Sequence, residues 1–376
     1  MTCIAILFTS YGPYHIARLA SFYNHYNQLG VNIVGLELAR HEAEYAWQAQ
    51  VEELPFKVIS VIEKQQLEEV SLTQLLRQLY AVLSQLKPDI IVIAGYARPA
   101  MLATLLWCLG NQKPRVLLSA TKKDDAPRSW WSEMLKKWIL KQYKAALVGG
   151  QPQKRYLVEL GMPAEAIFLG YNVVGNESYH PKKIKSLPLP VERPYFLAIN
   201  RFVPKKNLLF LISAYAAYRQ TTGADAWDLV LCGEGVLRPQ IEQKIAEFDL
   251  KNVVHLPGFL QQDELLPYLA HAHCFIHASI QEQWGLVVNE AMAAGLPVLV
   301  SNRCGCFEDL VIENVNGFGF DPDNSQQLID LMLKISSGET DLAKIRYAAL
   351  EHIQKFSPDY FAQGLIQAVE YAIAHR

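Results

Sequence analysis

Three things are scarce in this 376-residue chain: net charge, cysteine and long apolar runs. The formal net charge is only −2, so the chain has no general attraction for nucleic acid, and any phosphate binding must be local. The most apolar stretch, residues 90–109, contains Gly95, Arg98 and Pro99, and it predicts a strand, a loop and a helix in place of a membrane span. We therefore expect no nucleic-acid partner and no transmembrane helix in this stretch.

The six cysteines are scattered, which predicts buried thiols in a reducing compartment and no disulfide framework. Cys304 and Cys306 lie close together, but no second cysteine pair or suitably spaced histidine completes a tetrahedral metal site. Residues 2–8 contain neither a basic group nor a small-residue cleavage site, so they predict a first strand and not a signal peptide. We expect a cytoplasmic enzyme that holds no cofactor.

Two other groups of residues could suggest a metal. The three histidines between residues 271 and 277 span a helix end and a strand, so we do not expect them to converge. Asp321 and Asp323 form a D-x-D pattern, but Asn324 and Ser325 follow directly and lead into a helical pattern over 326–335. A turn and a helix N-cap explain this pattern better than a metal site does.

Length and periodicity predict two α/β domains. A chain of 376 residues exceeds what one hydrophobic core usually supports. Apolar runs recur in the first half, with helical patterns such as 16–27, 72–86 and 156–160 between them; the runs are 4–8, 33–38, 58–62, 90–94, 116–118, 145–148 and 167–169. Strands that are apolar on both faces predict a parallel sheet covered by helices on both sides. The expected parts are a first domain (1–175), an extended and solvated linker rich in proline and lysine (176–194), and a second domain (195–357).

The second half is organised around residues 279–300, which predict a strand end, a loop, a helix and another buried strand. Glu282 in the loop and Glu290 in the helix interrupt this apolar segment, and an unpaired buried carboxylate costs on the order of several kcal/mol. The first turn of the helix offers unpaired N–H groups to an anion; its residues are Gly285, Leu286 and Val287. The pattern predicts a pocket for a sugar, a ribose and a phosphate. The alternative is a polar loop followed by an exposed helix carboxylate.

Cations and glycines follow the other strands of this half. Arg201 leaves the strand that begins at Tyr195, and Lys206 lies near the next helix start, where the helix dipole favours anions. Both are explained by a diphosphate bound between them; solvated side chains after a turn are the alternative. Gly233 and Gly258 end two further strands, which on its own is a weak signal because any tight turn favours glycine.

These motifs, in this order, resemble those of glycosyltransferase family four, whose E-x7-E signature corresponds to Glu282 and Glu290. The family consists of retaining enzymes with the GT-B fold. The resemblance therefore implies two Rossmann-like, doubly wound parallel-sheet domains that face each other across a cleft, with a C-terminal helix, 358–376, that returns to the first domain.

The resemblance also assigns roles to individual residues. It implies that Glu282 faces the donor sugar, that Glu290 binds the ribose and that backbone amides at Gly285, Leu286 and Val287 contact the diphosphate. Arg201 and Lys206 match the family's cations that grip the diphosphate, although Asn200 stands where a glycine is usual. The turns at Gly233 and Gly258 would line the donor site.

Two loops of the first half follow predicted strands and are expected at the ligand-binding edge of the sheet. The first contains Gly12, expected to permit a tight turn, and His15, expected either in the active site or as a polar residue that opens a helix. In the family this loop borders the acceptor and the donor phosphates, usually with paired glycines. The second loop, 121–128, has no counterpart of the histidine that many family members carry there. We take Asp125 and Arg128 as its substitutes; the alternative is a surface loop.

Residues 129–144 predict a basic amphipathic helix with Trp131, Leu135, Trp138 and Ile139 on one face. Such a helix either packs on its own sheet or rests on anionic lipid at the inner face of a membrane. Together these patterns predict metal-independent transfer of a sugar from a UDP- or GDP-sugar to a hydroxyl of a sugar, a lipid or a small molecule. The resemblance implies that the transfer retains the anomeric configuration. A nucleotide-sugar 2-epimerase is the alternative enzyme, and a two-lobed sugar-binding protein is the non-enzymatic alternative.

Overall fold

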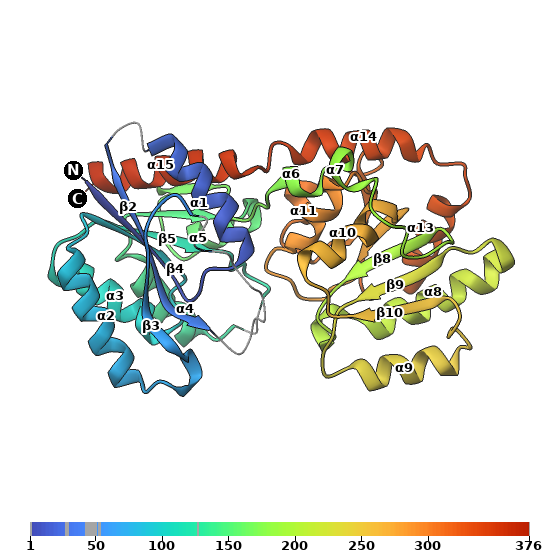
Figure 1. Cartoon of the computed structure of the whole chain (residues 1–376), viewed down its shortest axis with the longest axis horizontal. Helices are drawn as coiled ribbons and strands as arrows, with labels where there is room; N and C mark the ends of the chain where they lie inside the picture. The colour runs from blue at the N-terminus through green and yellow to red at the C-terminus, as the bar shows by residue number, and fades with distance from the viewer. Residues whose placement is uncertain (1, 27–29, 42–50, 52–53, 126–127, 376) are drawn as a thin grey trace. The chain divides into compact units, whose positions relative to one another are not determined.

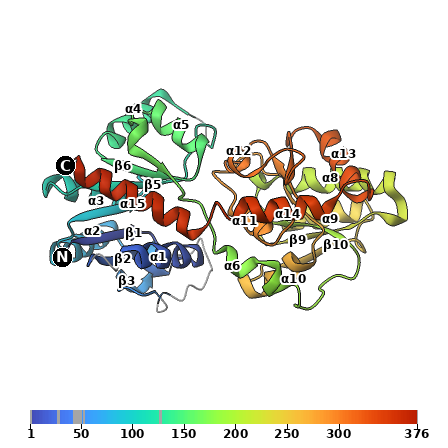
Figure 2. The same cartoon turned by 90° about the horizontal axis from the view of Figure 1, so that it is seen from above.

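The protein is described here by a computed structural model, which places residues 2–26, 30–41, 51, 54–125 and 128–375. The chain divides into two compact units, Met1–Gly175 with Phe356–Arg376 and Asn176–Lys355. Each unit is a parallel β-sheet with helices on its faces (Figures 1 and 2). The predicted fold class, two Rossmann-like parallel-sheet α/β domains, is confirmed.

The first unit contains seven parallel strands in the order β3-β2-β1-β4-β5-β6-β7. The strands are β1 (Cys3–Phe8), β2 (Asn32–His41), β3 (Val58–Gln66), β4 (Ile90–Ala94), β5 (Arg115–Ser119), β6 (Ala145–Val148) and β7 (Ile167–Leu169). The helices are α1 (Pro13–Tyr26), α2 (Leu72–Leu86), α3 (Pro99–Gly110), α4 (Trp130–Leu140), α5 (Gln151–Glu159) and α15 (Pro358–Ala374). Because the order reverses between β1 and β4, the loops after these two strands diverge at the sheet edge.

Alternating residues of this sheet contribute to two separate cores. Ile4 and Ile6 of β1 pack with α1 and α15 on one face, whereas Ala5 and Leu7 pack with α2, α3 and α5 on the other. Both faces are therefore buried, which explains the continuous apolar runs in the sequence. Helix α15, from the end of the chain, lies along α1 and strands β5, β6 and β7 (Figure 2).

The second unit contains six parallel strands in the order β10-β9-β8-β11-β12-β13. They are β8 (Tyr195–Ile199), β9 (Asp228–Cys232), β10 (Val254–Gly258), β11 (Cys274–His277), β12 (Val298–Ser301) and β13 (Gly317–Phe320). The helices are α6 (Asn176–Tyr179), α7 (Pro181–Ile184), α8 (Leu208–Thr222), α9 (Arg238–Glu247), α10 (Gln262–His271), α11 (Leu286–Ala293), α12 (Phe307–Leu310), α13 (Ser325–Ser336) and α14 (Leu342–Ile353). Helices α8, α9 and α13 pack on one face of the sheet.

The expectation of an extended, solvated linker over 176–194 is wrong for residues 176–184, whereas residues 185–194 form no helix or strand and are mostly exposed. The first part of this segment forms α6 and α7, and their residues Asn176, Tyr179 and Ile184 are buried. The Asn176 amide donates to the carbonyl of Ile353 at 2.9 Å. Proline misled the prediction because Pro181 stands at the first position of a helix, where its missing N–H costs nothing.

Most boundaries in the first unit follow the sequence pattern. Strands β4, β6 and β7 and helix α2 have the predicted limits. Helix α1 begins earlier than expected, at Pro13, and the expected helix end at Asn27 lies outside the described residues. Helix α5 begins at Gln151 and not at Tyr156, because its polar first turn carries no apolar periodicity. Residues 90–109 form a strand, a loop and most of a helix, as predicted, and no helix in the described part of the chain is long and apolar enough to cross a bilayer.

Candidate active site

Two loops of the second unit meet at the carboxyl ends of β8 and β11. These strands are neighbours, and the strand order reverses between them, which is where open α/β sheets bind ligands. The loop after β8 forms a 3-10 turn over Pro204–Lys206, and the loop after β11 leads to α11. The N–H of Ile280 donates to the carbonyl of Lys205 at 2.9 Å and ties one loop to the other. This hydrogen bond brings Lys206 to the side of the loop that carries Glu282.

Lys206 and Glu282 form an ion pair between the Lys206 Nζ and Glu282 Oε2 atoms. Both side chains are largely buried, at 12% and 13% exposure. The sequence placed both residues in one site but gave each a ligand as its partner. In the structure they are also partners of each other, which satisfies a carboxylate that would otherwise be costly to bury.

His277 and Ser279 complete this cluster. The His277 Nε2 atom lies 3.3 Å from Glu282 Oε2, and the Ser279 hydroxyl lies 3.2 Å from that nitrogen and 3.4 Å from the same carboxylate oxygen. The imidazole is fully buried, and its Nδ1 atom has no hydrogen-bond partner. The tautomer with the proton on Nε2 is therefore favoured, because it donates to the carboxylate and leaves only a lone pair unsatisfied.

The surroundings keep the His277 imidazole neutral and the Glu282 carboxyl ionised. Burial lowers the pKa of His277, although the hydrogen bond to Glu282 opposes the shift, and the imidazole is neutral near pH 7. Burial by itself favours the neutral form of Glu282, but the hydrogen bond from His277 and the charge of Lys206 outweigh it and lower the pKa of the carboxyl below its ordinary value. Glu282 is therefore a fixed anion at neutral pH.

Sequence reasoning missed His277 as a member of the site. It was considered only as a metal ligand, with the other two histidines of that stretch. One signal could have found it: His277 is the last residue of a buried strand, next to the loop that carries Glu282. A polar side chain at that position faces the ligand-binding edge of a parallel sheet.

The loop that carries Glu282 is held from both sides. The carbonyls of Glu282 and Trp284 accept hydrogen bonds from the N–H groups of Gly305 and Cys306, each at 3.1 Å. The indole N–H of the buried Trp284 donates to Asn289 at 2.8 Å. These contacts hold the backbone of residues 282–284 in place, so the position of the Glu282 carboxylate is preorganised.

Helix α11 begins directly after this loop. Its N-cap, Gly285, has φ +103°, and a Cβ atom there would lie 3.3 Å from His277 Nε2, so both conformation and space favour glycine. The N–H groups of Leu286 and Val287 have no acceptor within the helix, because they belong to its first turn. The start of α11 can therefore receive an anion beside the Lys206–Glu282 pair.

Glu290 lies further along the same helix and is 2% exposed. Its Oε1 atom accepts a hydrogen bond from the hydroxyl of Tyr179 in α6 at 3.1 Å. The carboxylate thus has a protein partner within the second unit, from the segment that we had expected to be a linker. Its expected contact with a ribose stays a prediction.

The expected glycine turns lie at the same edge of this sheet. The N–H of Gly233, after β9, donates to the carbonyl of Gly258 at the end of β10 at 2.7 Å. A Cβ atom on Gly233 would lie 1.8 Å from the carbonyl oxygen of Asn200, and φ is +138°, so only glycine fits. Arg201, which follows Asn200, is exposed at this edge.

In the first unit, Gly12 and His15 open α1 after β1. His15 Nδ1 accepts a hydrogen bond from the N–H of Gly12 at 2.9 Å, and its ring lies 4.0 Å from that of Phe8. Burial and the nearby charge of Arg18 lower the pKa of His15 to about 3, so the ring is neutral. The chain turns tightly at Gly12, as expected, since the N–H of His15 donates to the Gly12 carbonyl at 3.0 Å. The φ of Gly12 is not positive, and a Cβ atom there would meet only His15 Nδ1, at 3.9 Å, so the turn does not require glycine.

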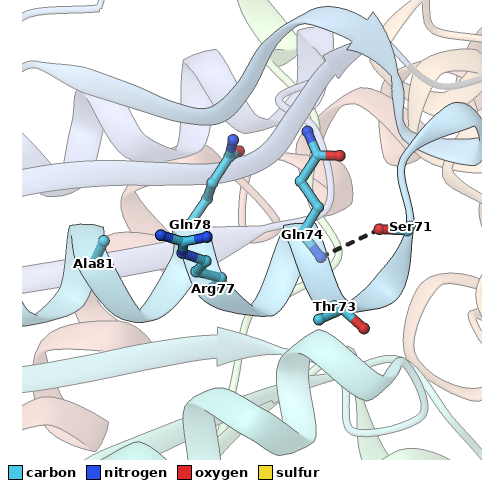
Figure 3. A pocket seen from close by; sticks show the side chains of 6 residues that line it. All are labelled: Ser71, Thr73, Gln74, Arg77, Gln78 and Ala81. Atoms are coloured by element: carbon cyan, nitrogen blue, oxygen red, sulfur yellow. Dashed lines mark hydrogen bonds between the residues drawn. The ribbon is translucent and has the colours of Figure 1, made fainter.

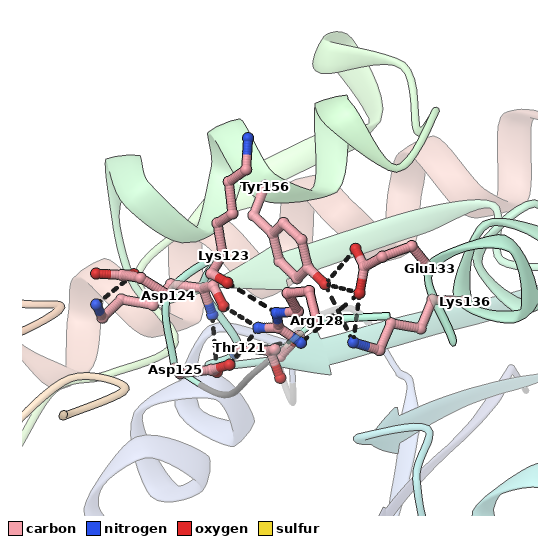
Figure 4. A network of polar contacts seen from close by, with 10 residues as sticks. Thr121, Lys123, Asp124, Asp125, Arg128, Glu133, Lys136 and Tyr156 are labelled. Atoms are coloured by element: carbon pink, nitrogen blue, oxygen red, sulfur yellow. Dashed lines mark hydrogen bonds and ion pairs between the residues drawn. The ribbon is translucent and has the colours of Figure 1, made fainter. Parts of the chain in front are cut away.

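Asp125 lies in the loop after β5, and its carboxylate is buried within that loop (Figure 4). Asp125 Oδ2 accepts from the N–H of Lys122 at 3.0 Å, and Oδ1 pairs with the guanidinium of Arg128. Residues 126 and 127 of the expected loop lie outside the described part of the chain. The carboxylate therefore organises the loop, and a catalytic role for Asp125 stays a prediction.

The pattern Asp321-x-Asp323 forms a turn, as expected. Arg303 lies 3.1 Å from Asp321 and also pairs with Asp323, and the side chain of Asn324 caps α13 by accepting from the N–H of Gln327 at 3.1 Å. Among the residues that the structure places, no group of three or more His, Cys, Asp or Glu side chains could hold a metal ion.

A pocket of about 440 Å³ lies along α2, and none of the predicted site residues lines it (Figure 3). It is lined by Ser71, Thr73, Gln74, Arg77, Gln78 and Ala81. All six come from this helix and its N-cap, where the Ser71 hydroxyl accepts from the N–H of Gln74 at 3.3 Å. The pocket therefore lies on a helix surface and shares no residue with the cluster around Glu282.

Comparison with solved structures defines the class of the fold. The chain is similar to Anabaena HepE in complex with UDP and glucose, with a TM-score of 0.77, 20% identity and coverage of 98% of this chain and 100% of that one. It is equally similar to sucrose-phosphate synthase from Thermosynechococcus elongatus, with a TM-score of 0.77, 18% identity and full coverage of both chains. The fold is therefore that of the GT-B glycosyltransferases.

Sequence comparison identifies similarity to a family of glycosyl transferases within the second unit. Residues 180–352 match the family described as glycosyl transferases group 1. The chain is 30% identical over 204 residues to the amylovoran biosynthesis glycosyltransferase AmsK of Erwinia amylovora, and 24% identical over 218 residues to an alpha-1,3/1,6-mannosyltransferase of Homo sapiens. These matches cover 53% and 54% of this chain and 49% and 52% of the relatives, so the chain spans about half the length of the curated relatives it matches.

Proposed function

We propose that the protein transfers a sugar from a nucleoside-diphosphate donor to an acceptor hydroxyl, with retention of configuration and without a metal ion. One observation carries the proposal: an ionised Glu282 is held by Lys206 at the switch point of the second sheet, beside the start of α11 and the turn at Gly233. This arrangement offers a carboxylate to sugar hydroxyls, and cations and N–H groups to a diphosphate. The names of the relatives support transferase chemistry.

Departure of a nucleoside diphosphate leaves negative charge that must be stabilised. Lys206, Arg201 and the first-turn N–H groups of α11 are the positive groups of the second unit that serve this purpose in the proposal. Glu282, which is already an anion, orients the donor sugar, and His277 and Ser279 keep its carboxylate in place. The charge is thus neutralised by protein groups, as a metal-independent reaction requires.

The donor is a UDP- or GDP-sugar in this proposal, and the acceptor is a sugar, a lipid or a small molecule. Similarity to a protein solved with UDP and glucose supports a nucleotide-sugar donor. The epimerase alternative is not favoured, because the relatives found by sequence are named transferases. A 2-epimerase would turn over the donor with no acceptor present, so incubation of the donor alone separates the two reactions.

A donor panel scored by nucleotide release tests the proposal. Lys206→Ala and Glu282→Gln should each lower turnover at least about 100-fold, as expected for loss of a preorganised transition-state contact. Lys205→Ala is the matched control, since it removes the adjacent charge but keeps the backbone carbonyl that accepts from Ile280. Near-normal turnover in both site variants would contradict the proposed roles. Loss of turnover in a chelator would contradict metal independence, and an inverted anomeric centre in the product, read by NMR, would contradict retention.

A further inference from the structure

Polar side chains of helix α4 in the first unit contact the neighbouring helix α5. Glu133 accepts hydrogen bonds from the hydroxyl of Tyr156 in α5 at 3.0 and 2.8 Å, and the ammonium of Lys136 lies 2.8 Å from Glu133 and 3.2 Å from the same hydroxyl (Figure 4). Only Ile139 and Leu140, at the end of the helix, are buried. The side of α4 that faces its own unit is therefore fixed largely by a polar network.

The opposite side of α4 is apolar and exposed. Its residues, which we call the tryptophan face, are Trp130 at 58% exposure, Trp131 at 68%, Met134 at 55%, Leu135 at 59% and Trp138 at 58%. They occur at helical spacing and so form one continuous stripe. Scattered exposed apolar residues are common on proteins, but a contiguous exposed stripe marks an interaction site. The alternative in which the predicted face packs on its own sheet is wrong for Trp131, Leu135 and Trp138, although Ile139 does pack in the core.

Charge on this helix indicates the kind of partner. Lys137 within the helix and Lys141 at its C-cap are exposed beside the tryptophan face. Glu133 is the one acidic residue between Trp130 and Lys141, and it is turned inward and paired with Lys136. The exposed side of α4 therefore combines indole rings and lysines without a carboxylate.

We infer that the tryptophan face of α4 docks on the surface of an anionic lipid bilayer, with Lys137 and Lys141 at the lipid headgroups. Tryptophan favours the boundary between headgroups and acyl chains, and lysine is attracted to anionic lipid. With 11 residues, α4 is too short to span a bilayer and would lie in the plane of the interface. A second copy bound by two-fold symmetry would present the same lysines and no carboxylate from α4, so a bilayer is the better complement. The inference concerns a binding partner and does not depend on the proposed reaction.

Sedimentation of the full chain with vesicles tests this inference. Vesicles of equal parts phosphatidylglycerol and phosphatidylcholine should bind the protein, and vesicles of phosphatidylcholine alone should bind it much more weakly. Trp131→Ser/Trp138→Ser should weaken binding at least about tenfold, because both side chains lose their burial in the interface. Lys137→Gln/Lys141→Gln should weaken it roughly fivefold for each lysine. Leu106→Ser, at a site in α3 that is 56% exposed, is the control and should bind like the unaltered chain.

Quenching of tryptophan fluorescence by brominated lipid locates the contact. The unaltered chain should be quenched, whereas Trp130→Phe/Trp131→Phe/Trp138→Phe should still sediment with the vesicles but lose most of the quenching. Binding to neither vesicle type, or equal binding by the Trp131→Ser/Trp138→Ser variant, would overturn the inference. A dimer in analytical ultracentrifugation that Trp131→Ser/Trp138→Ser converts to a monomer, without vesicle binding by either form, would assign the face to a second copy instead.

Discussion

The Lys206–Glu282 pair makes a quantitative prediction about stability that is independent of any substrate. Removing one partner of a buried ion pair costs about 3–5 kcal/mol, because the other charge is left buried and unpaired. Both side chains keep slight exposure, and Glu282 keeps its contacts with His277 and Ser279. We therefore expect Lys206→Met and Glu282→Gln each to destabilise the second unit by about 2–3 kcal/mol.

The double variant distinguishes this reasoning from a general effect of substitution. Lys206→Met/Glu282→Gln leaves no unpaired charge, so it should cost less than the sum of the single changes, with a coupling energy of about 2 kcal/mol. Because the two units need not unfold together, hydrogen exchange of peptides from β8 and β11 is the appropriate measurement. Additive effects of the two changes would refute the ion pair as a source of stability.

The same ion pair predicts that the free energy of unfolding decreases as the pH falls. The pKa of the Glu282 carboxyl is lower in the folded chain than its ordinary value of 4.5. The unfolded chain therefore binds more protons just below pH 4.5, so the stabilisation is present above that pH and is lost as the pH falls. In Lys206→Met, which removes one cause of the lowered pKa, this acid-side loss should be smaller. An unchanged acid-side slope would contradict the assignment.

Three further predictions concern other residues. Gly233→Ala should weaken donor binding at least tenfold in calorimetric titration with UDP or GDP, because its Cβ atom would overlap the carbonyl of Asn200. Gly110→Ala, at the end of α3, is the control and should bind normally, because a Cβ atom there meets nothing. The pKa of His15 is about 3 in the folded chain and 6.5 in the unfolded chain, so between these values only the unfolded chain binds this proton. The free energy of unfolding should therefore fall as the pH drops from about 6.5 to about 3. His15→Gln should reduce this dependence of stability on pH in acid titrations. Tyr156→Phe removes the hydroxyl that donates to Glu133, so it should weaken the packing of α4 against α5 by about 1–3 kcal/mol. Hydrogen exchange should become faster in α4 but not in α2.

The sequence predicted much of the architecture because local patterns carry it. Continuous apolar runs identify parallel strands whose two faces are both covered, and β4, β6 and β7 have the expected limits for this reason. Lys206 and Glu282 were also visible as charged side chains in the loops after two strands, whereas His277 was missed. The first part of the predicted linker, residues 176–184, differs from the prediction because composition does not show whether a short helix finds a surface to pack on, as α6 does against α11.

The chain by itself determined most of the helices and strands, and it placed Lys206, Glu282 and Gly233 in segments that follow strands. Only the tertiary structure decided which of these residues are partners. Lys206 and Glu282 are 76 positions apart in sequence and meet because β8 and β11 become neighbours, which no local period encodes. In the same way, the sequence showed that α4 has an apolar stripe, but the hydrogen bonds between Glu133 and Tyr156 decided that the stripe faces outward. The partner of Lys206 and the orientation of α4 both depend on residues that are distant in sequence but close in space. The sequence pattern alone therefore cannot predict either of them.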